Sequence, residues 1–127
     1  NFGAADGFHI IGLIKNNYFN EGFAFEVDEK SKKELKINIA NNGLNDKINV
    51  YGKASFEDLN IKFNDRDFEK SLYLVDVEGE EFNLFTESNL KFFINSYGII
   101  ENHEFFIKDK KKIDSFYKLF YDVLYSP

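Results

Sequence analysis

The sequence predicts an α/β fold with a mostly parallel sheet. Short apolar runs alternate with longer segments of helical periodicity, and several of the apolar runs end in acidic residues. Strands that alternate with helices pair in parallel through crossover connections. Because the chain has 127 residues, of which 43% are hydrophobic, we expect one domain over 1–127 with a single core.

The elements of the first half follow from short patterns. A helix is predicted over 8–15 because apolar residues give it a broad buried face, and a buried strand over 23–28 because turn residues bound an apolar run. The next helix is predicted over 29–42, with Gly43 as the residue that ends it, and the next strand over 48–51. Residues 53–70 fit a short strand or a loop equally well.

The second half repeats the alternation. An apolar run predicts a strand over 71–75, and helical segments are expected at 82–85 and 89–95, ended by Tyr97-Gly98. A further strand is predicted over 99–106. The last helix is expected over 108–125, with these residues at core-facing spacing: Ile113, Phe116, Tyr117, Phe120, Val123 and Leu124.

The opening residues have the composition of a ligand-binding turn. Gly3 and Gly7 flank two alanines and Asp6, and an apolar helical segment follows directly. Glycine allows positive φ and close approach of backbone to a ligand, and a helix start adds free N–H donors. Similar turns also occur in α/β domains that bind nothing.

A carboxylate follows the strand predicted over 23–28. Glu26 lies 19 residues after Gly7, close to the ~20-residue spacing at which an acid accepts hydrogen bonds from ribose hydroxyls in dinucleotide-type folds. The alternative is that Glu26 or Asp28 favours the N-terminus of the next helix, and for Asp28 we prefer that alternative.

Acidic residues and a histidine follow the two later strands. Asp76 and Glu78 are two residues apart, as are Glu101 and His103, so each pair is expected on one side of its strand. Paired carboxylates repel one another unless a cation or donor compensates, and histidine suits proton transfer near neutral pH. We interpret Glu80 and Glu81 as a solvated turn or a charge preference at a helix start.

Five segments resemble, in order, the motifs of S-adenosylmethionine-dependent methyltransferases of the FkbM type. They are NFGAADGF at 1–8, AFEVD at 24–28, NIANNGL at 38–44, VDVEGEE at 75–81 and IIENHE at 99–104. The resemblance implies a class I methyltransferase fold, a Rossmann-like three-layer α/β/α sandwich. It also implies that the chain is truncated at both ends, since the strand before the glycine loop and the terminal antiparallel strands are missing.

The resemblance also implies roles for residues. Cofactor contacts fall on Gly3, Ala5, Asp6, Gly7, Glu26, Ala54, Ser55 and Asp76, and substrate contacts on Glu78 and His103. We expect transfer of a methyl group to a hydroxyl of a small molecule or sugar, with His103 as the base and Glu101 or Asp76 orienting it.

Composition and alternatives limit this hypothesis. A net charge of −6 argues against general nucleic-acid binding, and no apolar run is long enough to span a bilayer, so a cytoplasmic enzyme is the default expectation. No metal is part of the prediction, although the acids and His103 supply ligands fit for Mg²⁺ or Mn²⁺. A scaffold domain without catalysis stays open, whereas a dehydrogenase lacks the required glycine spacing.

Overall fold

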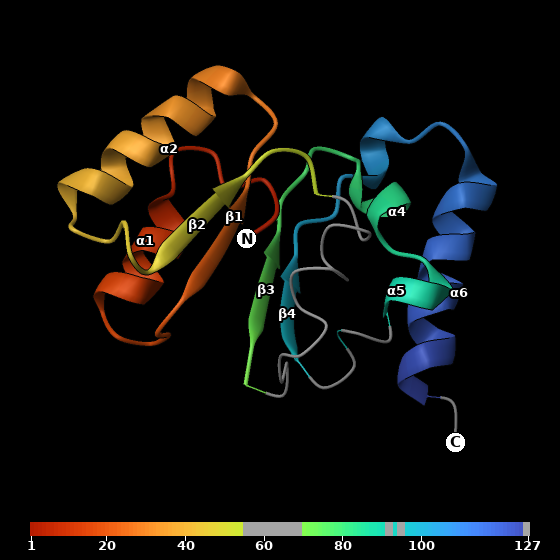
Figure 1. Ribbon diagram of the computed structural model, residues 1–127. Helices are drawn as coiled ribbons and strands as arrows, with labels where there is room; N and C mark the ends of the chain where they lie inside the picture. Colours follow the sequence, from red (N-terminus) through yellow and green to blue (C-terminus); the bar gives the residue numbers. More distant parts are fainter. Residues whose placement is uncertain (55–69, 91–92, 94–95, 126–127) are drawn as a thin grey trace. The chain divides into compact units, whose positions relative to one another are not determined.

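The protein has a mixed α/β structure, seen in a computed structural model that describes residues 1–54, 70–90, 93 and 96–125. It divides into two compact units, residues 1–54 and 55–127. Each unit contains a small parallel sheet of two strands, accompanied by helices (Figure 1). The α/β character and the parallel pairing predicted from the alternating pattern are therefore confirmed.

The first unit is a β-α-β arrangement preceded by a helix. Its elements are α1 (Phe8–Lys15), β1 (Gly22–Phe25), α2 (Glu29–Asn41) and β2 (Ile48–Tyr51). The strands pair in parallel, with Gly22 opposite Ile48 and Phe25 opposite Tyr51. An isolated parallel bridge from Phe2 to Phe25 extends this sheet to the residue just before the glycine turn.

The two helices of the first unit pack on one face of its sheet. Ala24 belongs to the same buried cluster as Ile10 and Ile14 of α1 and Leu35 of α2. The side chains that alternate with Ala24 form a stack of rings on the other face: the Phe25 ring lies 5.1 Å from that of Phe2 and 5.2 Å from that of Tyr51. The period of two thus gives this sheet an aliphatic face and an aromatic face.

The ends of α2 are fixed by its capping residues. The Asp28 carboxylate accepts a hydrogen bond of 2.7 Å from the Ser31 N–H, and this bond lowers the pKa of Asp28. At the other end, Gly43 has φ 67°, the left-handed conformation that commonly follows a helix. Both capping roles predicted from the sequence are confirmed.

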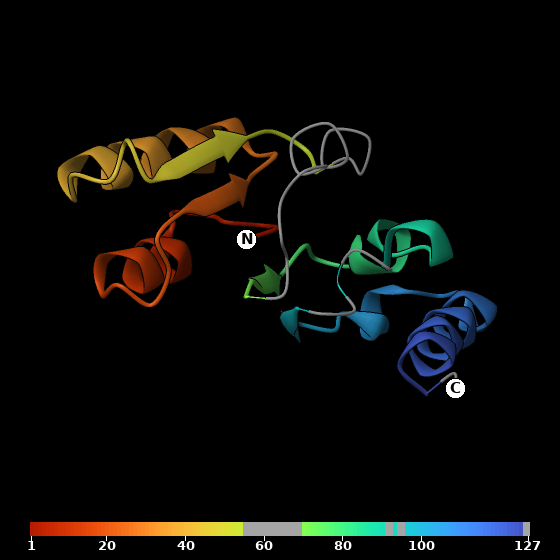
Figure 2. The ribbon, with the colours of Figure 1, turned by 60° about the horizontal axis from the view of Figure 1, so that its bottom comes forward.

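The second unit is another β-α-β arrangement, closed by a long helix. Its elements are β3 (Leu72–Val75), α4 (Glu81–Leu84), α5 (Glu87–Leu90), β4 (Tyr97–Ile100), the 3-10 turn η2 (Glu104–Phe106) and α6 (Lys110–Tyr125). The two strands pair in parallel, with Leu72 opposite Tyr97 and Val75 opposite Ile100. Figures 1 and 2 both show α4 and α5 close to α6.

Aromatic rings fill the interior of the second unit. Phe85, which directly follows α4, contacts the Phe116 and Phe120 rings of α6, with centroids 6.3 and 5.2 Å away. On the sheet side, the Tyr73 ring lies 6.4 Å from Phe85 and 4.7 Å from Phe93. Of the α6 residues expected to face the core, Phe116 is buried, but Tyr117 is 47% exposed.

Three predicted boundaries are wrong. The strand expected over 99–106 begins earlier and ends at Ile100, and Tyr97-Gly98 starts it instead of ending a helix. The strand expected over 23–28 stops at Phe25. The helix expected over 89–95 begins at Glu87, and residues 91–92, 94–95 and most of 53–70 lie outside the described residues.

Gly7 allows the close contact between α1 and α2. Its φ is 91°, and a Cβ added there would lie 2.5 Å from Leu35 Cδ1 and 2.8 Å from Ile11 Cδ1. We therefore expect Gly7→Ala to lower the free energy of unfolding by about 2–4 kcal/mol, through left-handed strain and overpacking, measured by urea denaturation. Gly12→Ala is the control: it lies inside α1 with nothing within 4 Å of an added Cβ, and should be neutral or stabilising by up to about 1 kcal/mol. Equal effects of the two substitutions would contradict this account.

Gly98 allows the Tyr73 ring to lie across β4. The two residues are opposite one another in the parallel register, and a methyl group on Gly98 would overlap the ring. We expect Gly98→Ala to destabilise the protein by about 1–3 kcal/mol, measured by thermal unfolding. In a Tyr73→Leu background, which removes the ring, the same substitution should cost much less. Additive effects in this double-mutant cycle would show that the ring is not the cause.

Candidate acid–histidine site

Two loops of the second unit bring a histidine and three acids together. β3 and β4 are parallel, so their carboxyl ends lie at the same edge, and the Glu101 N–H donates to the Val75 carbonyl with a 2.8 Å bond just beyond the strands. Asp76 and Glu78 follow β3, whereas Glu101 and His103 follow β4. The structure thus brings together the two pairs of residues that the sequence placed after the two later strands.

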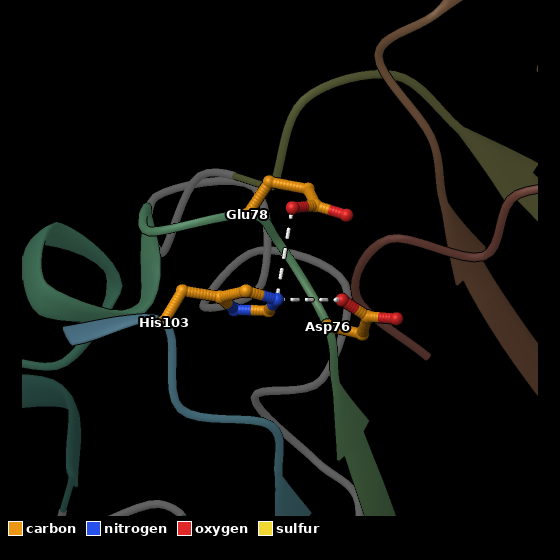
Figure 3. Close-up of side chains that lie close together, drawn as sticks. All are labelled: Asp76, Glu78 and His103. Atoms are coloured by element: carbon orange, nitrogen blue, oxygen red, sulfur yellow. Dashed lines mark ion pairs between the residues drawn. The ribbon is translucent and has the colours of Figure 1, made fainter. Parts of the chain in front are cut away.

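The imidazole of His103 is the centre of this cluster. Its Nε2 lies 3.6 Å from Asp76 Oδ1, 3.6 Å from Glu78 Oε2 and 3.7 Å from Glu101 Oε1. In Figure 3 the Asp76 and Glu78 carboxylates approach the same edge of the ring. The side chain of His103 is 5% exposed, whereas those of the three acids are between 49% and 75% exposed. A buried imidazole therefore directs one nitrogen toward accessible carboxylates.

The positions of these four side chains are determined by the conformations of the loops and not by the alternation of side chains along a strand. We expected each pair on one side of a strand, but β3 ends at Val75 and β4 at Ile100, so none of the four residues lies within a strand. Glu78 has φ 52° and Gly79 has φ 96°, two left-handed residues that turn the chain sharply after β3. The left-handed conformation of Glu78 is uncommon for a residue with a Cβ and locates local strain at the site.

Glu81 holds the two loops together. Its side chain is fully buried, and its carboxylate accepts a 2.9 Å hydrogen bond from the Gly79 N–H and a 2.7 Å bond from the His103 N–H. Glu81 Oε1 also lies 3.4 Å from His103 Nδ1, which is buried and makes no hydrogen bond. Of the two interpretations of Glu81, the solvated turn is wrong, whereas its position in the first turn of α4 agrees with a charge preference at a helix start. No local pattern distinguishes it from the exposed Glu80, because its partner lies 22 residues further along the chain.

Aromatic residues support and border the His103 loop. The Tyr117 hydroxyl of α6 donates to Glu104 Oε2 with a 2.7 Å bond, which raises the pKa of Tyr117, and it accepts a bond from the Asn102 amide. Phe106 is nearly parallel to the imidazole, with ring centroids 5.8 Å apart, and is 55% exposed. The cluster thus has an apolar border on one side.

In the first unit, Glu26 braces the glycine loop. One of its carboxylate oxygens accepts a 2.8 Å bond from the Ala5 N–H, and the other accepts a 2.8 Å bond from the Asp28 N–H. The structure thereby joins Glu26 to the loop at 3–7. Each oxygen keeps a second lone pair, so a ribose hydroxyl remains a possible donor.

The other predicted cofactor residues have mixed positions. Gly3 and Ala5 have φ values of 73° and 46°, so alternate residues of this loop adopt the left-handed backbone conformation. Asp6 is exposed and accepts from the Phe8 N–H, and its carbonyl accepts from the Asn38 amide of α2. A Cβ added at Gly7 would meet side chains of α1 and α2, so Gly7 has a packing role. Ala54 is half-buried after β2, and Ser55 lies outside the described residues.

Comparison with protein families, curated proteins and solved structures found no significant match. The resemblance to FkbM-type methyltransferases therefore remains a prediction that rests on the five sequence segments. Within the described parts of the chain, none of the helices has the length and apolar character needed to cross a bilayer.

Removing the charge of Glu81 should destabilise the second unit. In Glu81→Gln an amide NH₂ replaces one carboxylate oxygen and faces a backbone N–H, so one buried donor loses its acceptor. We expect a loss of about 2–4 kcal/mol in the free energy of unfolding, measured by urea denaturation. Glu80→Gln, at an exposed neighbour, should change it by less than about 0.5 kcal/mol. A comparable effect of both substitutions would contradict the bracing role of Glu81.

Proposed function

We propose that the protein is an S-adenosylmethionine-dependent methyltransferase that methylates a hydroxyl group of a small molecule or sugar. The proposal includes a Rossmann-like three-layer arrangement and gives each unit a role. The first unit binds the adenosyl cofactor through the glycine loop and Glu26. The second unit supplies the groups that receive the acceptor's proton.

One observation carries the cofactor assignment. The Ala5 N–H donates to Glu26, which couples the glycine loop after the Phe2 bridge to the acid after β1. In open α/β sheets, ligands bind outside the carboxyl ends of the strands, and an acid in this position is suited to ribose hydroxyls. The residues that would touch the methionine portion and the ribose are thus held in one hydrogen-bonded assembly.

Methyl transfer needs little covalent help from the protein. The S–CH₃ bond of the sulfonium breaks with its electron pair returning to sulfur, a C–O bond forms, and the hydroxyl proton must go to a base. His103 is the proposed base, since its buried ring directs Nε2 toward solvent-accessible carboxylates. Asp76 and Glu101 stabilise the imidazolium that forms, and Glu78 adds a further carboxylate next to the acceptor.

Calorimetry with S-adenosylhomocysteine tests the cofactor assignment directly. We expect saturable binding of one ligand per chain, and a loss of about 10-fold or more in affinity for Glu26→Gln, because a ribose acceptor is removed. Glu34→Gln, which neutralises an exposed acid of α2, and His103→Gln should both bind the ligand as the wild type does. NAD⁺ should give no heat of binding. A wild-type chain that binds no S-adenosylhomocysteine would favour a scaffold domain and overturn the proposal.

A further inference from the structure

We infer that Asp76, Glu78 and His103 form a binding site for a divalent cation of the first transition row. Their three ligand atoms all lie within 4.8 Å of one another. Ligand atoms that share an ion at about 2.1 Å are about 3.0–4.2 Å apart, depending on the angle between them. The separations of 3.6 Å from Nε2 to each carboxylate lie in that range and are longer than hydrogen bonds.

The charges of the cluster require compensation. Three carboxylates lie within 3.7 Å of a single nitrogen, which carries at most one proton and can donate to one of them. Within the described ranges, Asp76, Glu78 and Glu101 make ion pairs with His103 and with no lysine or arginine. A divalent cation would satisfy the imidazole lone pair and neutralise two carboxylates together.

The buried histidine is the second observation that points to a ligand. Its side chain is 95% buried, its Nδ1 has no hydrogen-bond partner, and its Nε2 is directed at the two acids (Figure 3). Behind the ring, Glu81 Oε1 lies 3.4 Å from Nδ1. A carboxylate on this side favours the tautomer with the proton on Nδ1, which leaves the Nε2 lone pair free for an ion.

The ligand set favours particular ions. Carboxylates suit Mg²⁺ and Mn²⁺, whereas imidazole favours transition metals, so a mixed set with one nitrogen fits Mn²⁺, Fe²⁺ or Zn²⁺ better than Mg²⁺. The two carboxylates are 49% and 75% exposed, so an ion can enter from solvent and keep water or an acceptor oxygen as further ligands.

The consequence for the reaction rests on the proposed function. Ion binding and proton acceptance use the same Nε2 lone pair, so a loaded site would not use His103 as a base. A hydroxyl bound to the ion would be acidified, and its proton would pass to Glu101, the third carboxylate near Nε2. The ion site itself depends on residues of the second unit alone.

Titration with Mn²⁺, followed by the electron paramagnetic resonance of the free ion, tests this inference without any cofactor. We expect one tight site per chain, weakened at least about 10-fold in Glu78→Gln, whose exposed side chain can change without affecting folding. Glu87→Gln removes the same charge from an exposed position on α5 and should leave the affinity unchanged. Absence of a tight site, or equal affinity in both variants, would overturn the inference.

The bound Mn²⁺ should also show nitrogen coupling in an electron spin echo experiment. The chain has two histidines, so His103→Gln should remove the coupling and His9→Gln, at an exposed position of α1, should keep it. Coupling that persists in His103→Gln, or is missing in the wild type, would contradict ligation by His103. Because S-adenosylhomocysteine takes no part in either measurement, loss of the ion site and loss of the cofactor assignment give different results.

Discussion

Each unit depends on a buried carboxylate that accepts backbone N–H groups from the loops at the carboxyl ends of its strands. Glu26 accepts from Ala5 and Asp28, and Glu81 accepts from Gly79 and His103. Bonds to an ionised acceptor are about twice as strong as those between neutral groups, and leaving a buried donor unpaired is costly. Loops that would otherwise have free backbone groups are thereby fixed in single conformations, and the side chains on them acquire defined positions.

This constraint accounts for the geometry of the acid–histidine site. Glu78 adopts a left-handed conformation although it has a Cβ, and His103 is buried although it is polar. Both conditions raise the energy of the folded chain, and the Glu81 bridge between the Gly79 and His103 loops holds them in place. Strain and buried polar groups that are maintained in this way concentrate at sites of ligand binding and catalysis, which is the physical basis of the functional proposals.

The two units reach similar topologies with different interiors. The first packs aliphatic side chains of α1 and α2 on its sheet, and Gly7 lets the helices approach closely. The second relies on tilted and edge-to-face rings, and Gly98 provides the space for Tyr73. In both, a glycine is required because a neighbouring large side chain occupies the position of its missing Cβ, so the glycines are part of the packing as well as of the turns.

The sequence by itself determined the parallel α/β elements, the caps of α2 and the positions of the acids after the apolar runs. These features depend on local periodicity and on backbone preferences within a few residues, which a single sequence displays. Tertiary structure decided the rest: where β1 and β4 end, that Glu81 is buried while Glu80 is exposed, and that His103 directs Nε2 toward three carboxylates. Most of these outcomes depend on contacts such as Ala5–Glu26 and Glu81–His103, which join residues more than 20 positions apart and have no signature in the local pattern.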